Sequence, residues 1–497
     1  MDFIKNINEK ILKIGIILSA LLFSIPSIIY YIQNGTVLNF KEEYCFLLNN
    51  QDTLIQTIVY IAILISFTIF YYLIIKKNKE IFKNIKQILY FVAIVGLFFV
   101  VMIPFESSDI FYYLGIGKLQ STYNQNPYYQ SIKEYVDNNN VDMSNDTVLK
   151  KGYSNYWSNT TVVYGAIWTL ICRIIAGMSF GNVDIGLILF KILNLIIHIV
   201  NCYLMYKISK KKIFSIIYGL NPFVLLETIA NVHNDIFIVF FILLAFYFVK
   251  NRKNLTLSVF CLACATAIKY FAILLLPVVI IYSYRDKDIK VRIIKCIQYG
   301  LIFFIFLILP YLVYIQDLQV FKGMADQQSK ITKGIYLVIL EYFTKTDNLV
   351  YILSKLALTV FILIYLIKCV TLLIKKKISL RKEMQQMYLF MLAFIFLLIT
   401  GFQPWYLMWL SPFIIWQKSK DIKLITQMQI LTQIANSVFL IYSENYIYGV
   451  PFFFIFLTGT LICIIKNKKK SNLYRKRRVK QWNYYYIHVV HHVVYIV

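Results

Sequence analysis

Charged side chains are scarce in this sequence, and acidic side chains are the scarcest. Only 15% of the 497 residues are charged, and 24 Asp and Glu stand against 51 Lys and Arg, which gives a net charge of +27. Hydrophobic residues make up 59% of the chain, which is more apolar side chain than a soluble protein of this length can bury. Apolar runs of about 20 residues recur, each long enough to cross a bilayer. The composition therefore excludes a soluble protein and predicts an all-helical, polytopic membrane protein.

The sequence has no disulfide framework either. Of its eight cysteines, only Cys45 lies outside an apolar run. Cys261 and Cys264 have the spacing of a metal or redox pair, but their neighbours are apolar and no second pair accompanies them. We interpret both as small buried residues, because unpaired cysteines are often buried.

The basic residues are concentrated in short tracts between the apolar runs, beginning near residues 76, 207, 250, 285, 375 and 466. This is the positive-inside pattern of membrane proteins, in which Lys and Arg gather in cytoplasmic loops and contact anionic lipids. No stacking platform or nucleic-acid motif accompanies the charges, so we expect membrane lipid and no nucleic acid as a partner.

The basic tracts determine the expected topology in a cell membrane, with both termini in the cytoplasm. The expected spans are residues 12–32, 54–75, 88–104, 185–206, 214–228, 236–249, a hairpin over 255–284 that turns near Lys269, 293–314, 349–374, 387–402, 405–416, 424–442 and 448–465. They amount to about 12 to 14 crossings within one transmembrane domain, residues 1–466. A basic, poorly ordered cytoplasmic tail over 467–497 is expected to follow.

A long polar segment, residues 105–159, follows the third span on the outer side and is rich in Asn, Tyr and Ser. Loops of this length are usually functional. The apolar run over 162–180 comes next, and counting it as a span would move every later basic tract to the outer side. We therefore interpret it as an interfacial or re-entrant helix of the extracytoplasmic loop, residues 105–180. Arg173 in its middle favours this, since a charge that faces lipid is costly.

Polar side chains collect at the outer ends of separate spans. Glu106 and Asp109 follow the third span, NVHND (231–235) lies between two spans, and FQPWY (402–406) lies between two more. Singly, each has an ordinary explanation: a solvated loop start, an Asn- and Asp-rich turn, or an interfacial aromatic belt. Together they indicate a site, because an aromatic belt does not require His, Asp and Gln at the mouths of several spans.

Several motifs resemble those of membrane glycosyltransferases of the GT-C superfamily. The order SSDIFYYLGIGK, YGAIWTL, NPFVLLETIANVHNDIFIVFFILLAFYF, ATAIKYFAILLLP and FQPWYLMWLSP is similar to that of the bacterial polyprenol-phosphate-mannose-dependent α-mannosyltransferases, over about residues 105–412. The resemblance implies a GT-C-like helix bundle and an enzyme that moves a hexose, mannose in that family. The donor it implies is a polyprenyl-phosphate sugar, the acceptor is an extracytoplasmic glycan or glycolipid, and no cofactor takes part. It also implies that Asp109, the acid of the first large outer loop, is the catalytic base.

One carboxylate is sufficient for the implied reaction. Phosphate is a good leaving group, whereas glycosidases need two carboxylates because their leaving group is a poor one. A single base that accepts the proton of the acceptor hydroxyl then supports direct displacement with inversion. Beside Phe111, Tyr112 and Tyr113, the Asp109 carboxyl is expected to be partly desolvated, which raises its pKa and makes it a better base. Glu106 is the second candidate.

The other candidate site residues divide by their chemistry. Lys269, His233 and Arg173 offer positive charge or donors to the leaving phosphate. Amides and acids bond sugar hydroxyls, and an aromatic ring stacks on the apolar face of a sugar. The residues expected to bind substrate on this basis are Asn234, Asp235, Gln403, Trp405 and Tyr406, with Tyr112 and Asn126 from the outer loop. No acid pair stands at tight spacing, so we predict no metal.

Two alternatives remain open. A lipid or polysaccharide transporter or flippase also carries charge within the membrane, but it would place polar residues near the midplane and often has two related halves. A non-catalytic subunit of a wall-assembly complex is the other alternative. Replacing Asp109 by Asn distinguishes them, because an enzyme would lose turnover and still bind the lipid donor, whereas a flippase would be much less sensitive.

Overall fold

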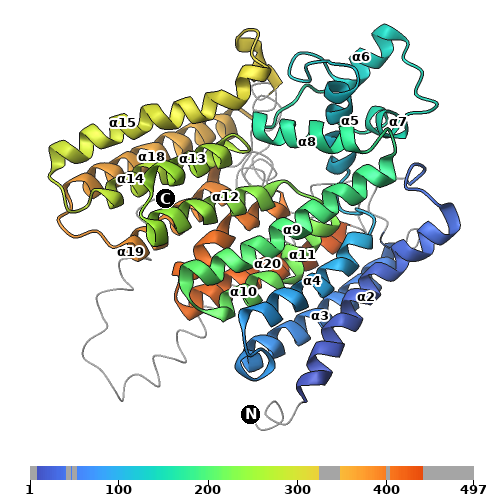
Figure 1. Ribbon diagram of the computed structural model, residues 1–497, viewed down its shortest axis with the longest axis horizontal. Coiled ribbons are helices and arrows are strands. Elements are labelled where there is room, and N and C mark those ends of the chain that lie inside the picture. The colour runs from blue at the N-terminus through green and yellow to red at the C-terminus, as the bar shows by residue number, and fades with distance from the viewer. Residues whose placement is uncertain (1–7, 41–45, 47–52, 324–346, 399–402, 440–497) are drawn as a thin grey trace.

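The computed structural model describes residues 8–40, 46, 53–323, 347–398 and 403–439, and every regular element in these ranges is a helix (Figure 1). The prediction of an all-helical fold is confirmed. The predicted tail over 467–497, the predicted span over 448–465 and Cys45 lie outside the described residues.

One bundle of helices comes mainly from the N-terminal half of the chain. Its members are α2 (Glu9–Asn34), α3 (Thr53–Ile81), α4 (Ile85–Val101), α9 (Val183–Ser209), α10 (Lys212–Gly219), α11 (Pro222–Leu225), the π-helix η1 (Leu226–Ala230) and α20 (Ser419–Phe439). Helix α2 packs against α3 and α4, and α4 packs against α9. Helix α20 contacts α3 and α11, so the last described helix returns to the first bundle.

A second group of helices lies beside the first (Figure 1). Its members are α12 (Asp235–Tyr247), η2 (Phe248–Arg252), α13 (Leu255–Thr266), η3 (Tyr270–Leu275), α14 (Leu276–Ser283), α15 (Ile289–Ile308), η4 (Leu309–Val313), η5 (Leu318–Phe321), α18 (Asp347–Ile374), α19 (Leu380–Ala393), η6 (Phe394–Leu398) and η7 (Pro404–Trp416). Helix α12 packs against both α9 and η7, and so joins the two groups. The predicted hairpin is confirmed, because η3 and α14 pack back against α13 with Lys269 in the turn.

Five helices in the described ranges are long and apolar enough to cross a bilayer, and a bent pair adds a sixth. The five are Glu9–Asn34, Leu54–Ile81, Val183–Ser209, Ile289–Val313 and Ile352–Ile374, and the pair is Lys212–Gly219 with Pro222–Ala230, bent by 58°. These are fewer than the predicted crossings. Part of the difference arises because several apolar runs form short helices, such as Leu255–Thr266, which are shorter than the about 20 residues that a span needs. The predicted span over 448–465 lies outside the residues compared.

The long helices of the second group carry apolar side chains on their outer surface. Leu301 and Ile305 of α15 are 62% and 64% exposed, and Ile367 of α18 is 64% exposed. A soluble protein rarely leaves contiguous apolar surface of this size open to water. These surfaces are suited to contact with lipid, and the protein is a membrane protein.

The outer loop predicted over residues 105–180 forms a helical cap at one end of the first bundle (Figure 1). It contains α5 (Asp109–Ser121), α6 (Ile132–Asn139), α7 (Thr147–Tyr153) and α8 (Ala166–Met178). Helix α8 has 13 residues and is about 20 Å long, too short to cross the roughly 30 Å hydrocarbon core, as predicted. It packs closely along α5, where a Cβ on Gly117 would lie 2.2 Å from the Cys172 carbonyl oxygen.

The same end of the bundle gathers the C-terminal end of α2 and the N-terminal end of α9. Thr36 Oγ1 and Val37 N donate hydrogen bonds to the carboxylate of Asp184, at 2.5 and 2.9 Å. Helix α7 of the cap contacts α9 as well. Helices α2 and α9 therefore run in opposite directions and meet beside the cap, as the alternating topology requires.

Candidate active site

Backbone contacts fix the cap to the hairpin turn and so bring separate segments together. Gly165 N donates to the carbonyl of Ile268 at 3.3 Å, and Ile167 N donates to the carbonyl of Ala267 at 3.2 Å. Glycine is required at position 165, since a Cβ there would lie 2.1 Å from the Ala267 carbonyl oxygen. The segment that precedes α8 therefore lies against the turn that carries Lys269.

Asp109, the first residue of α5, lies where the cap meets this turn. Its Oδ2 accepts hydrogen bonds from the hydroxyls of Tyr113 and Tyr164, at 3.2 and 3.4 Å. The side chain is half-buried. Burial raises the pKa of the Asp109 carboxyl, while the charge of nearby Lys269 and the two tyrosine hydroxyls oppose that rise. A carboxylate with long hydrogen bonds, partial exposure and a raised pKa is suited to accept a proton.

Lys269 and Asp235 form an ion pair at the centre of the cluster. Lys269 Nζ lies 2.8 and 3.0 Å from the two carboxylate oxygens of Asp235, whose side chain is fully buried. The indole N–H of Trp409 donates to the same carboxylate. The ammonium also lies over the rings of Tyr406 and Trp409, 4.8 and 5.5 Å from their centroids. These contacts hold one positive charge in a defined place beside Asp109.

The NVHND and QPWY segments meet through their rings. The imidazole of His233 stacks on the indole of Trp405, with centroids 3.8 Å apart and planes inclined by 18°. Burial and the charge of Lys269 lower the pKa of His233, so its ring is neutral near pH 7. The preceding Val232 has φ +60°, a strained conformation for a β-branched residue that is typical of functional sites.

Two buried polar side chains near the stacked rings of His233 and Trp405 have atoms without a hydrogen-bond partner among the described residues. The Asn234 amide and the Glu227 carboxylate are buried, and neither has a hydrogen-bond partner among the residues that the structure describes. Glu227 Oε2 lies 3.4 Å from His233 Nε2, without the geometry of a hydrogen bond. Since buried polar groups are nearly always satisfied, this part of the site has capacity for water or a polar ligand.

Glu106, the second candidate base, has a different environment. Its carboxylate accepts hydrogen bonds from Tyr60 of α3 (3.0 Å), Asn231 (2.6 Å) and Gln433 of α20 (2.8 and 2.9 Å). The residue is 6% exposed. Because donors occupy both oxygens and water is excluded, this carboxylate is suited to join three elements and poorly suited to accept a proton from substrate.

The other predicted site residues lie apart from the cluster or at its edge. The hydroxyl of Tyr112 donates to the Thr160 carbonyl at 3.1 Å, and the amide of Asn126 donates to the Tyr314 carbonyl at 2.7 Å. Arg173 is exposed on α8. Gln403, directly before η7, is half-buried.

Sequence reasoning missed several residues of the cluster. Tyr164 and Trp409 contact Asp109 and Asp235, but they carried no signal in a chain with 40 Tyr and many other aromatic residues. Glu227 had a signal, because an acid within the apolar run NPFVLLETIA is costly unless it is functional. Gln433 had none, since its contact with Glu106 depends on the packing of α20.

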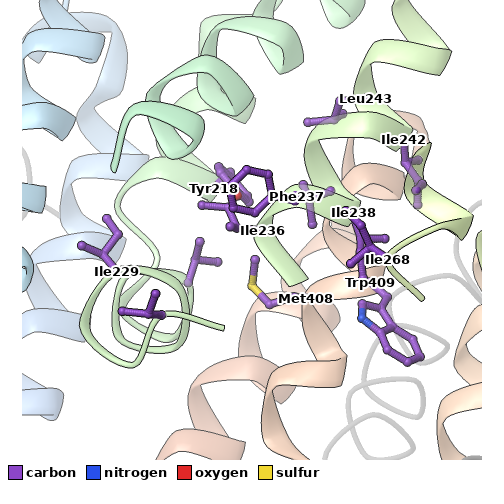
Figure 2. Packing of buried hydrophobic residues seen from close by; sticks show 14 of the residues in the cluster. Tyr218, Ile229, Ile236, Phe237, Ile238, Ile242, Leu243, Ile268, Met408 and Trp409 are labelled. Atoms are coloured by element: carbon purple, nitrogen blue, oxygen red, sulfur yellow. The ribbon is translucent and has the colours of Figure 1, made fainter. Parts of the chain in front are cut away.

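The polar cluster rests on apolar side chains from the same elements. Figure 2 shows Ile236 and Ile238 of α12, Ile268 of the hairpin turn, and Met408 and Trp409 of η7 in one packed group. All five are buried. This packing fixes the separation of Asp235, Lys269 and η7, which is what a site assembled from three segments requires.

One family is similar to this chain over more than half its length. Residues 17–285 match the N-terminal domain of the alpha-(1->6)-mannopyranosyltransferases. The chain belongs to this family. The matched range includes Asp109, His233, Asp235 and Lys269, and the resemblance to GT-C mannosyltransferases is thereby confirmed. No curated protein and no solved structure matches the chain. The protein is a mannosyltransferase of the membrane, and its polytopic helical fold is consistent with the GT-C architecture.

Proposed function

We propose that this mannosyltransferase takes mannose from a polyprenyl phosphate and transfers it, with inversion, to a hydroxyl of an extracytoplasmic glycan or glycolipid. Asp109 acts as the general base. The observation that carries the proposal is the environment of Asp109, a half-buried carboxylate in one cluster with Lys269 and Asp235 from two other segments.

The proposed reaction is a single displacement. The acceptor oxygen attacks C1 of mannose, and the new C1–O bond forms as the bond from C1 to the phosphate oxygen breaks. The proton of the acceptor hydroxyl passes to Asp109, and the electron pair of the broken bond leaves with the polyprenyl phosphate. Phosphate needs no proton in order to leave, so one base is sufficient. Attack opposite the leaving group inverts C1.

The hydrogen bonds of Asp109 support its role as the base. Both tyrosine hydroxyls donate to Oδ2, and among the described residues no hydrogen bond ends on Oδ1. That oxygen is therefore available to an acceptor hydroxyl. Partial burial raises the pKa of Asp109, which brings its proton affinity closer to that of a base that works near neutral pH.

Lys269 supports the departure of the phosphate. An ammonium has three N–H donors, and that of Lys269 donates to both carboxylate oxygens of Asp235. The Lys269 side chain is still 18% exposed, so its charge is accessible to an anion. A positive group that is already positioned stabilises the negative charge that develops as the C1–O bond breaks.

The sugar is proposed to bind between the NVHND and QPWY segments. Trp405 and Tyr406 are half-buried and offer aromatic faces to a pyranose, and the Asn234 amide has unfilled donors and acceptors for sugar hydroxyls. His233 positions Trp405 through their stacking contact. Gln403, directly before η7, is also proposed to contact the sugar.

The lipid donor explains why the fold is apolar. A sugar that is linked through phosphate to a polyprenyl chain cannot leave the bilayer, so the transferase must work at the membrane surface. The five apolar helices long enough to span supply this setting. The positive-inside pattern supports an extracytoplasmic cap and site.

The test is a transfer assay with the purified full-length protein in lipid nanodiscs. Polyprenyl-phosphate mannose labelled in the sugar is supplied with α-mannoside acceptors, and the anomeric configuration of the product is determined by NMR. We expect an α-linked product from a β-linked donor, and we expect Asp109→Asn to bind donor without turning it over.

A vesicle assay for lipid translocation distinguishes the transporter alternative. If the wild-type protein moves a labelled lipid across the bilayer, transfers no sugar, and is indifferent to Asp109→Asn, the proposed function is wrong. Lys150→Ala is the matched control, because Lys150 is an exposed cap residue on α7.

A further inference from the structure

A polar cavity of about 250 Å³ lies between the cap and the segment around η5. Three segments line it: residues 128–134, which include the first turn of α6, the stretch before α8, and the residues around η5. The side chains that give it chemical character are Glu134, Asn159, Gln319 and Lys322, all of them exposed, with the ring of Tyr129. The cavity is therefore open to water on the cap.

The lining of this cavity suits an uncharged, polyhydroxylated ligand. Asn159 and Gln319 contribute amides, and Thr160 and Thr161 contribute hydroxyls, and each of these groups can both donate and accept a hydrogen bond. One carboxylate and one ammonium, from Glu134 and Lys322, balance each other in charge. A phosphate site would concentrate positive charge, whereas amides, hydroxyls and an aromatic ring are the groups that bind sugars.

The cavity is preformed, because contacts made by its own lining residues hold its walls together. The Tyr129 hydroxyl accepts from the backbone N–H groups of Gln316 and Asp317, at 3.0 and 2.9 Å, and lies 3.0 Å from the Asp317 carbonyl. Gly323 packs so tightly that a Cβ there would lie 2.6 Å from the Val162 carbonyl oxygen. The segment around η5 is thus docked on the cap.

One stretch of chain connects the cavity to the proposed base. Thr160 lines the cavity, and its carbonyl accepts from Tyr112, on the same helix as Asp109. Four residues later, the hydroxyl of Tyr164 donates to Asp109. Four steps of an extended chain span at most about 14 Å, which is within the length of a short oligosaccharide.

We infer that this cavity is a subsite for the acceptor, and that the acceptor is an uncharged oligosaccharide of several sugar residues. This rests on the proposed function, in which the terminal hydroxyl of the acceptor meets Asp109. The sugars behind that terminus then lie along residues 160–164 and enter the cavity. An acceptor with more residues should bind more tightly than a disaccharide.

The test compares acceptors of increasing length on two proteins. The acceptors are α-1,6-linked manno-oligosaccharides, from the disaccharide to the pentasaccharide, and the variant carries Asn159→Ala, Gln319→Ala and Lys322→Ala together. We expect the wild-type KM to fall with acceptor length. In the variant, we expect the KM for the pentasaccharide to rise roughly tenfold, as loss of one or two hydrogen bonds predicts, with the length dependence removed. Lys150→Ala should keep the length dependence.

Two results would overturn the inference in distinguishable ways. If the variant keeps the wild-type length dependence while Asp109→Asn abolishes transfer, the cavity is not a subsite and the proposed function stands. If the wild type transfers no mannose, calorimetric titration with the pentasaccharide alone measures whether the acceptor binds. Binding that the triple variant loses would keep the glycan site and reject the proposed function, whereas no binding to the wild type would reject the subsite.

Discussion

Glu106 and Asp109 lie on the same short stretch of chain, yet their surroundings are opposite. Glu106 is 6% exposed and accepts hydrogen bonds from three side chains in three separate segments of the chain. Asp109 is half-buried, accepts long hydrogen bonds from two tyrosine hydroxyls, and lies near the charge of Lys269. The same chemical group is therefore enclosed in one case and accessible in the other.

This contrast shows why acidity and position in the sequence do not identify a base. A carboxylate with its lone pairs occupied by donors is stabilised as an anion, and it has no free site for a proton from substrate. A carboxylate that is partly buried and incompletely hydrogen-bonded keeps its proton affinity and stays accessible to substrate. We therefore assign structural work to Glu106 and proton transfer to Asp109, and four predictions test that division.

The largest expected effect is on turnover at Asp109. Replacing Asp109 by Asn keeps the shape and removes the proton acceptor, so we expect kcat to fall roughly 10²- to 10⁴-fold with an unchanged melting temperature. Labelled product formation measures kcat, and thermal unfolding in detergent measures stability. A variant with near-normal kcat would end the assignment of Asp109 as the base.

The second effect is on stability at Glu106. Replacing Glu106 by Ala leaves the donors of Tyr60, Asn231 and Gln433 without their acceptor, so we expect about 2 to 4 kcal/mol loss of stability. Thermal unfolding in detergent gives the shift, and Asp109→Ala is the matched control with a small one. If Asp109→Ala loses this much stability and Glu106→Ala loses little, the structural role assigned to Glu106 is wrong.

Much of this fold could be predicted from the sequence, because the signals for it, basic tracts and apolar runs, each lie within a short segment of the chain. The basic tracts predicted that successive helices alternate in direction, and the length of one apolar run predicted the helix break near Lys269. The meeting of Asp109, His233 and Lys269 followed from placing their segments on one membrane face. The short helix α8 was foreseen because a further span would have inverted the later basic tracts.

The parts that the sequence did not predict depend on packing between distant helices. The closure of Glu106 by Gln433 needs α20 to return to α3, and nothing near either residue indicates that. The exposure of Arg173 depends on which face of α8 packs against α5. Within the described residues, fewer helices than expected are long enough to span, because apolar runs that form short or bent helices have the composition of spans.

The third prediction concerns the charge beside Asp109. Replacing Lys269 by Gln removes the positive charge that lowers the pKa of Asp109, so that pKa rises. A base works only when deprotonated, and kcat/KM therefore falls on the acid side at a higher pH than in the wild type. We also expect kcat to fall up to roughly 100-fold, because the leaving phosphate loses a positive partner. Lys269→Arg keeps the charge and should keep the wild-type acid limb.

The smallest effect is expected at Tyr164, which touches Asp109 through one hydroxyl. Tyr164→Phe removes one hydrogen bond that lowers the pKa of Asp109, so the acid limb of the kcat/KM profile should again move to higher pH, by less than for Lys269→Gln. At low pH the variant should be several-fold slower, since a single hydrogen bond is worth about 1 kcal/mol, and at high pH the two profiles should converge. Tyr153→Phe is the control, because its hydroxyl donates to the Asp137 carboxylate. Equal slowing at every pH would mean that Tyr164 positions substrate and does not adjust the proton affinity of Asp109.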